Sequence, residues 1–221
     1  MPMVRDGLYY GISLLVVAVI VWFGTQWVSL TAVPVLLAAF FLWFFRDPDR
    51  EIPAGPGVIV SPGDGKVEDA EWIETTAGSR FRVSIFLSVF DVHVNRSPMS
   101  GNVTLMEYRE GQFLNAMNAE SAVLNEQTLI VIDDGTHSVS FKQIAGLLAR
   151  RIVCDLKTGD TVQRGQRMGM IKFGSRVDVL MPADVELRVK PGDRVQGGSS
   201  VLGVLPGYGA DGAKKPSNGR G

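Results

Sequence analysis

The chain has 221 residues, enough for one sizeable domain or for a domain with an appendage. Hydrophobic residues make up 46% of it, and the formal net charge is −1 at pH 7, so no nucleic-acid partner is expected. The single cysteine, Cys154, excludes an intramolecular disulfide and fits a reducing compartment.

The N-terminal 45 residues hold most of the excess hydrophobicity, and only two of them are charged. Two apolar segments, 7–23 and 27–45, are separated by a short polar break. A membrane-spanning helix needs about 20 apolar residues, with a range of roughly 17–25. We therefore expect residues 1–45 to be a membrane anchor that forms a transmembrane helical hairpin. The alternative is a single tilted span with a re-entrant piece around Pro34.

Basic residues flank this anchor but are absent from the break within it. Arg5 precedes the first segment, and Arg46 and Arg50 follow the second. The positive-inside rule then places the N-terminus and everything after residue 46 in the cytoplasm. We expect a protein of the cell (inner) membrane whose globular part lies on the cytoplasmic face.

A charged junction with proline and glycine, 45–57, separates the anchor from a predicted globular domain, 46–206. Residues 107–126 are polar and predict a loop or a short helix, and 207–221 have the composition of a disordered tail. Short apolar runs between glycine turns predict β-strands and a mostly β (α+β) fold class. The predicted strands are 57–61, 80–88, 127–133, 137–146, 150–156, 168–174 and 176–182.

An internal repeat supports the β prediction. Residues 159–169 and 192–203 share the pattern G-D-x-V-x-x-G, which is typical of tight turns beside a strand. Such turns build lipoyl-like β-hairpin repeats, which we predict here. A lipoyl- or biotinyl-type carrier would also need a lysine at a hairpin tip, and Lys66 is the candidate near such a turn.

Polar residues with catalytic potential are few. The two histidines, His93 and His137, stand 44 residues apart and form no local metal motif, so no metal is expected. Alternation along a strand would place Asp91, His93 and Asn95 on one face. This face is either a solvated edge or a site, and the clustering of poor strand formers favours a site. Asp64 lies in a proline–glycine turn, where aspartate is common for structural reasons.

Gly-Ser pairs occur at 78–79, 174–175 and 198–199, but only Gly174–Ser175 joins two apolar strands. A serine hydroxyl can attack the preceding carbonyl when that peptide is distorted, and glycine admits the required backbone geometry. The resulting ester can break by β-elimination, and the dehydroalanine that remains hydrolyses to a pyruvoyl group. This chemistry needs a base for the hydroxyl proton and donors for the oxyanion.

Five segments together resemble the phosphatidylserine decarboxylase family, in its short bacterial and archaeal-type branch. The likeness runs from about residue 44 to 205, over nearly all of the globular part. The segments are FFRDPDR (44–50), SPGDGKV (61–67), FLSVFDVHVNRSP (86–98), QIAGLLARRIV (143–153) and FGSRVDVLMP (173–182).

The resemblance implies a carboxy-lyase that makes phosphatidylethanolamine and CO2 from a phospholipid in the bilayer. Cleavage between Gly174 and Ser175 would give chains 1–174 and 175–221, and Ser175 would become the pyruvoyl cofactor. That carbonyl would react with the substrate's amino group and act as an electron sink while CO2 leaves. Asp64 matches the family's aspartate that supports self-cleavage, and His93 matches the histidine of the decarboxylation step.

One position departs from the family pattern. Longer members carry a second histidine three residues after His93, where this chain has Arg96, which cannot act as an ordinary base. We therefore expect His93 to take both roles, with His137 as the alternative. Arg96, Arg150 and Arg151 are candidate contacts of the lipid phosphate, and a homo-oligomer is compatible with this function.

Two other functions fit parts of the sequence. The first is a non-catalytic, membrane-tethered carrier or adaptor with an intact chain and a modified Lys66. The second is a membrane-bound serine hydrolase that uses Ser175 on an external ester or amide, also with an intact chain.

Overall fold

The computed structural model describes residues 4–75, 78–118, 120–147, 151–172 and 174–208. It divides into two compact units, Met1–Asp49 and Arg50–Gly221. The candidate site lies wholly in the second unit.

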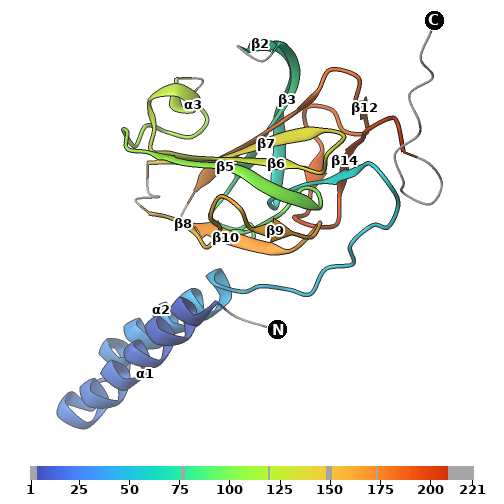
Figure 1. Ribbon diagram of the computed structural model, residues 1–221. Helices are drawn as coiled ribbons and strands as arrows, with labels where there is room; N and C mark the ends of the chain where they lie inside the picture. Colours follow the sequence, from blue (N-terminus) through green and yellow to red (C-terminus); the bar gives the residue numbers. More distant parts are fainter. Residues whose placement is uncertain (1–3, 76–77, 119, 148–150, 173, 209–221) are drawn as a thin grey trace, which may run out of the picture. The chain divides into compact units, whose positions relative to one another are not determined.

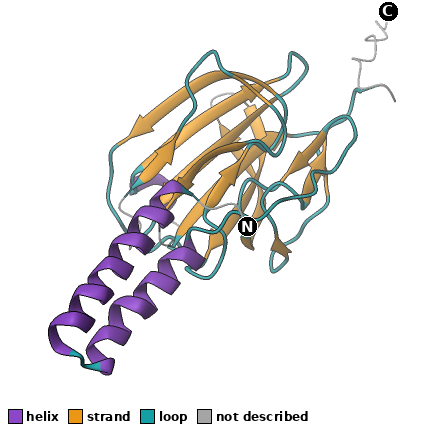
Figure 2. Cartoon of the chain, turned by 90° about the horizontal axis from the view of Figure 1, so that it is seen from below, coloured by secondary structure: helices purple, strands orange, loops and turns teal. Residues whose placement is uncertain are grey.

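The first unit consists of two helices, α1 (Arg5–Thr25) and α2 (Val28–Phe44), which run side by side (Figures 1 and 2). The ring of Tyr10 packs on Phe41 with 5.4 Å between centroids. Gly11 leaves room for Leu42, whose side chain lies 2.5 Å from where a Cβ on Gly11 would stand.

Helices were predicted over both apolar segments, and both form. In the part of the chain that the structure describes, α1 alone is long and apolar enough to cross a membrane, because α2 has 17 residues. Large apolar side chains on both helices are exposed. Whether the pair spans a bilayer stays a prediction.

The described residues of the second unit form one eight-stranded sheet, β13-β2-β3-β11-β7-β6-β5-β9, and two three-stranded sheets, β1-β14-β12 and β4-β10-β8. The predicted mostly β class is confirmed. The elements are β1 (Val58–Val60), β2 (Gly65–Thr75), β3 (Gly78–Leu87), β4 (Val94–Arg96), β5 (Gly101–Arg109), α3 (Ser121–Leu124), β6 (Gln127–Asp133), β7 (Ser138–Ala145), β8 (Ile152–Cys154), β9 (Thr161–Val162), β10 (Arg167–Ile171), β11 (Ser175–Pro182), β12 (Glu186–Leu187), β13 (Arg194–Val195) and β14 (Val201–Val204).

Strand β11 lies between β3 and β7 in the middle of the large sheet, antiparallel to both. Its first residue, Ser175, stands opposite Leu87 on one side and Ala145 on the other. Val177 and Val179 point to the same face as Ser175 and are fully buried in the core. This alternation of β-branched residues explains both the strand and its central position.

Two long strands, β2 and β5, were missed by the sequence analysis. Their sequences are rich in charged residues because much of each strand is exposed. In particular β5 extends to Arg109, into the stretch predicted as loop or short helix, and α3 accounts for the helix there.

The prediction of one alternating strand around His93 was wrong. Strand β3 ends at Leu87, a turn follows, and β4 begins only at Val94. His93 and Asn95 are both fully buried, whereas Asp91 belongs to the turn. The hydrogen-bonded turn interrupts the period-two pattern, so the three polar residues do not share a strand face.

The internal repeat recurs in the structure at the two edges of the large sheet, as β9 and β13. The N–H of Gly159 donates to Val103 O at 2.8 Å, and the N–H of Gly192 donates to Val67 O at 2.8 Å in the equivalent place. The repeat is therefore one turn used twice. A lipoyl-like relationship stays a prediction.

Lys66 does not fit the carrier hypothesis. It lies inside β2, opposite Phe86 and Arg194, and its ammonium is 3.4 Å from Glu68. It is therefore part of a sheet ladder, away from any hairpin tip.

The predicted tail begins at residue 207, but Tyr208 is part of the described structure. Its hydroxyl donates to the carboxylate of Asp134 and lies 3.2 Å from Nδ1 of His137. Residues 209–221, the rest of that prediction, lie outside the described residues.

Candidate active site

Ser175 is fully buried, and its hydroxyl oxygen has no hydrogen-bond partner among the residues that the structure describes. Most buried hydroxyls are paired, because an unpaired one costs about 1–3 kcal/mol. An orphaned hydroxyl in the middle of a sheet therefore needs an explanation, and readiness for a reaction is one.

Gly174 precedes this serine with φ +62°, in the left-handed region that glycine enters without steric cost. Its carbonyl oxygen packs against Gly146, where a Cβ would stand only 2.2 Å from that oxygen. Two glycines thus allow the peptide between residues 174 and 175 to lie in this position.

His93 contacts the same peptide segment. Its Nε2 accepts the N–H of Gly174 at 3.2 Å, and its Nδ1 lies 3.0 Å from the carbonyl oxygen of Asp91. A carbonyl can only accept, so the ring proton belongs on Nδ1 and the lone pair on Nε2. The buried ring therefore presents its basic nitrogen next to the Gly174–Ser175 peptide.

A hydrogen-bonded turn holds His93 in place. The Asp91 carboxylate accepts the N–H of Ser88 at 2.8 Å and its hydroxyl at 2.7 Å. Arg194 donates to the other carboxylate oxygen at 2.9 Å. The position of His93 thus depends on the turn that replaces the predicted strand.

Gln143 is a buried polar residue, two positions along β7 from the partner of Ser175, that the sequence analysis did not single out. It lies in β7 opposite Val177, on the face that also carries Ser175, and it donates to Asn95 Oδ1 at 2.9 Å. Both amides are fully buried, and within the described chain Asn95 Nδ2 and Gln143 Oε1 lack partners. A glutamine in phase with the buried apolar residues Val139 and Phe141 was the available signal, as was Gly146 in the same motif.

The Asp64 carboxylate binds other groups. Arg50 Nη2 donates to its two oxygens at 2.9 and 2.7 Å, and the N–H of Gly197 donates at 2.8 Å. Burial raises the pKa of Asp64 above its ordinary value, although the Gly197 N–H and the Arg50 charge oppose this. The carboxylate therefore joins the 61–67 turn to the start of the unit.

The remaining predicted residues are dispersed. Arg96 donates to the carbonyl of Gly165 at 3.1 Å, and Arg151 is exposed just before β8. Arg150 lies outside the described residues. His137 precedes β7 by one residue, eight residues before Ala145, which places it about 26 Å along the strand from Ser175. It cannot be the base for Ser175.

A cavity of about 300 Å3 is lined in part by Gly174. Its wall is mostly apolar and comes from four separate segments. The lining includes Phe86, Val89, Phe90, Ala116, Leu147 and Gly174.

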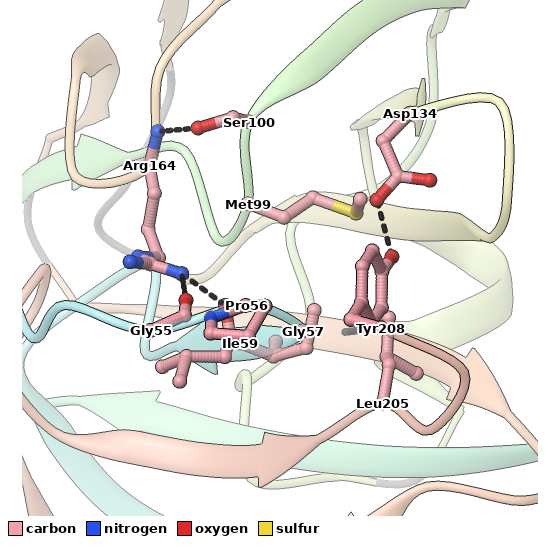
Figure 3. A pocket seen from close by; sticks show the side chains of 11 residues that line it. Gly55, Pro56, Gly57, Ile59, Met99, Ser100, Asp134, Arg164, Leu205 and Tyr208 are labelled. Atoms are coloured by element: carbon pink, nitrogen blue, oxygen red, sulfur yellow. Dashed lines mark hydrogen bonds between the residues drawn. The ribbon is translucent and has the colours of Figure 1, made fainter. Parts of the chain in front are cut away.

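A second cavity of about 240 Å3 lies elsewhere in the unit (Figure 3). There Arg164 donates to the carbonyl oxygens of Gly55 at 2.8 Å and Val58 at 3.1 Å, and Tyr208 donates to Asp134. Its described polar groups are mainly used to hold loops together. The Gly174 cavity is therefore the better candidate for chemistry.

Comparison with known proteins gives a concordant result. Residues 37–203 match the model of the phosphatidylserine decarboxylase family. The chain belongs to the phosphatidylserine decarboxylase family. It is 50% identical over 206 residues to the phosphatidylserine decarboxylase proenzyme of Solibacter usitatus, covering 91% of this chain and 96% of that one. The proenzyme of Symbiobacterium thermophilum is 48% identical, with 91% and 95% covered.

Family membership confirms the resemblance and the enzyme class, a carboxy-lyase. The carrier and hydrolase alternatives gain no support. The matched range includes Asp64, His93, Gly174 and Ser175. The chemical role of each residue stays a prediction.

Proposed function

We propose that the chain converts phosphatidylserine to phosphatidylethanolamine and CO2 with a pyruvoyl group made from its own Ser175. The observation that carries this proposal is the environment of one peptide bond. An orphaned, buried hydroxyl follows Gly174, whose N–H is bonded to His93 and whose carbonyl abuts Gly146. The word "proenzyme" in the relatives' names also supports a chain that is cut during maturation.

Self-cleavage begins when the hydrogen bond from the Gly174 N–H to His93 Nε2 breaks. The same nitrogen then accepts the proton of the Ser175 hydroxyl. The oxygen attacks the Gly174 carbonyl carbon, the C–N bond breaks, and the freed amine takes a proton. Loss of the Ser175 Cα proton then breaks the Cβ–Oγ bond and releases the Gly174 carboxylate. Water then hydrolyses the dehydroalanine. Its nitrogen leaves as ammonia, and a pyruvoyl group remains at the start of chain 175–221.

Asp64 acts in this scheme as a positioning residue. Its carboxylate is already bonded to Arg50 and Gly197, so it supports self-cleavage through the fold of the 61–67 turn. Arg96 is tied to a backbone carbonyl and has no role as a base. His93 therefore takes both proton-transfer roles.

The site's residues fit the cofactor that the family implies. A strand held on both sides keeps residue 175 in place after the cut, beside His93 and the apolar cavity. The pyruvoyl carbonyl supplies an electron-withdrawing centre for the carbon that loses CO2. His93 returns a proton to that carbon, the cavity wall limits water, and Arg151 contacts the lipid phosphate.

The N-terminal helices anchor the enzyme in the membrane that contains its substrate. Helix α1 has the length and composition of a span, and α2 completes the anchor beside it. The basic residues after α2 support an orientation in which the catalytic unit lies on the cytoplasmic face of the cell membrane.

The test is the intact mass of the denatured protein, together with CO2 release from phosphatidylserine. Wild type should give fragments 1–174 and 175–221, with the smaller one lacking its N-terminal amine. Ser175→Ala should stay uncut and inactive, whereas Ser79→Ala, at another Gly-Ser pair, should be cut and active. An uncut Ser175→Ala chain that still releases CO2 would exclude the pyruvoyl mechanism.

A further inference from the structure

Three segments that are distant in sequence each present an exposed, large apolar side chain near Gly174. Phe90 is 69% exposed, Met117 62% and Leu147 62%. We call these three side chains the apolar rim. Phe90 and Leu147 line the cavity beside Gly174, and Met117 directly follows Ala116, another lining residue.

The exposure of Phe90 is built into the fold. The Asp91 carboxylate and the backbone bond from Asp91 N to Ser88 O, 3.0 Å long, close the turn that carries Phe90 at its tip. The same Asp91 binds His93 through its carbonyl oxygen. An apolar side chain is thus held in water by the turn that positions the proposed catalytic base.

The other two members of the rim are linked to the reactive peptide in the same way. Leu147 directly follows Gly146, whose Cα abuts the Gly174 carbonyl oxygen. A Cβ on Gly146 would also lie 3.2 Å from the Cβ of Ala116, the residue before Met117. The Asn115 side chain accepts the Met117 N–H at 3.1 Å and fixes that bend.

Apolar groups gathered on a surface mark a contact with another apolar phase. The reactive group here lies among them, and the substrate that the proposed function requires carries its headgroup on an apolar glycerolipid. Arg151 adds an exposed cation beside this region, because its carbonyl accepts the N–H of Lys172, two residues before Gly174. Cations near a bilayer surface attract anionic headgroups.

We infer that the apolar rim docks on the surface of a phospholipid bilayer and inserts Phe90, Met117 and Leu147 among the lipids around the reacting headgroup. This inference rests on the proposed function for its choice of partner. It assigns membrane contact to the catalytic unit itself, in addition to the helices.

Docking is tested first without reference to catalysis. A single cysteine at position 90 or 147, in a full-length Cys154→Ser background, is labelled with an environment-sensitive fluorophore and reconstituted into phosphatidylserine–phosphatidylcholine vesicles. Quenchers attached to the lipids near the headgroups should quench both probes strongly, and an aqueous quencher should not.

The matched control is a probe at Trp72, which is 57% exposed. Trp72 pairs with Phe81 on β3. Phe81 is five residues from Phe86, which lines the cavity, so position 72 is about 17 Å from the cavity. The probe at position 72 should be quenched by the aqueous quencher. Probes at 90 and 147 that respond like the probe at 72 would overturn the inference.

Turnover gives the second readout. In the double variant Phe90→Ser/Leu147→Ser, the ratio of turnover on long-chain phosphatidylserine in vesicles to that on monomeric, short-chain phosphatidylserine should fall about tenfold or more. Trp72→Ser should keep the wild-type ratio. An unchanged ratio in the double variant would contradict docking, because the two side chains would then serve the site or the fold alone.

The two proposals can fail separately. If wild type releases no CO2 from either substrate but the probes at 90 and 147 are quenched by lipid, the proposed function is wrong and docking stands. If wild type is active but the probes stay in water, docking is wrong and the proposed function stands.

Discussion

At the scale of single residues, the site is a buried histidine and a peptide bond that approach each other across 81 residues of sequence. The carbonyl of Asp91 sets the tautomer of His93, and the left-handed backbone of Gly174 brings its N–H to Nε2. A neutral imidazole with its lone pair toward the reacting group is the form needed for general-base catalysis.

His93→Gln should slow self-cleavage by roughly 10²–10⁴-fold, because the amide cannot accept the serine proton. Any cleaved fraction should also decarboxylate slowly, since the same group returns the proton to the product. Mass spectrometry of the purified chain and CO2 release measure the two effects. The control is His137→Gln, which should be cut and active, and wild-type cleavage in His93→Gln would assign the base elsewhere.

Gly146→Ala should trap the uncut chain. Its Cβ would lie 2.2 Å from the carbonyl oxygen of Gly174, so the peptide must shift, and a displacement of about 1 Å can cost roughly 100-fold in rate. The rate of appearance of fragment 175–221 measures this, and thermal unfolding shows whether the variant is folded.

The control for backbone substitution is Gly135→Ala. Gly135 has φ +86°, and no neighbouring atom lies within 4 Å of where its Cβ would stand, so alanine there strains the backbone without touching the site. It should lower stability but leave cleavage intact. If Gly146→Ala is cut as fast as wild type, close packing of the carbonyl is not required.

At the scale of elements, the turn between β3 and β4 links several parts of the unit. Asp91 bonds Ser88 on its own turn and Arg194 on β13, and its backbone binds His93. The carboxylate is mostly buried, whereas the Arg194 side chain is 68% exposed. The two partners should therefore contribute very differently to stability.

Asp91→Ala should lower the Tm by several degrees, because it removes hydrogen bonds worth about 1–3 kcal/mol to a partly buried turn. It should also slow cleavage, since His93 loses its support. Arg194→Ala should change stability by less than about 1 kcal/mol, as exposed ion pairs do. Thermal unfolding in the uncut Ser175→Ala background measures the stability of both variants, and cleavage is measured with Ser175 in place. Equal losses of stability would mean that the ion pair alone holds the turn.

At the scale of the whole catalytic unit, the proposed cleavage requires fragment 175–221 to remain bound without a covalent link. Strand β11 lies between β3 and β7, β13 pairs with β2, and β14 pairs with β1. Beyond β14, Tyr208 donates to Asp134 on the larger fragment. The smaller fragment thus supplies strands to the eight-stranded sheet and to the β1-β14-β12 sheet, whereas the β4-β10-β8 sheet next to His93 comes from the larger fragment alone.

The Tyr208–Asp134 contact should depend on pH in a defined direction. Burial raises the pKa of Asp134, but hydrogen bonds from Tyr208 and from the N–H groups of His137 and Thr136 outweigh this and lower it. The folded state therefore binds this proton less tightly than the unfolded state does. The resulting stability is complete above the ordinary value of 3.8 and is lost as the pH falls through the lower, folded value.

Tyr208→Phe should therefore lower the Tm near pH 6, and its difference from wild type should shrink as the pH falls below about 4. Comparing the two proteins cancels the contribution of Asp64, whose raised pKa has the opposite sign: its stability is present at low pH and lost as the pH rises. A difference that stays constant from pH 6 to pH 3 would show that Asp134 does not titrate with this contact.

Several parts of the candidate site could be predicted from the sequence. The apolar N-terminal segments, the Gly174–Ser175 pair between apolar strands, and the family motifs around Asp64 and His93 are all local patterns. Strand β6 was predicted with its observed bounds because its apolar run ends at turn residues. Such features depend on side chains within a few residues of one another.

The tertiary structure decided which distant groups meet. The contacts of Gly174 with His93 and Gly146, and of Asp64 with Arg50 and Gly197, depend on strand register and loop packing in the whole unit. The polar strands β2 and β5 likewise form because neighbouring strands pair with them, against their own weak local preference. Local sequence determines turns and apolar runs, whereas the pairing of strands many residues apart is set by the free energy of the packed sheet, which no short segment contains.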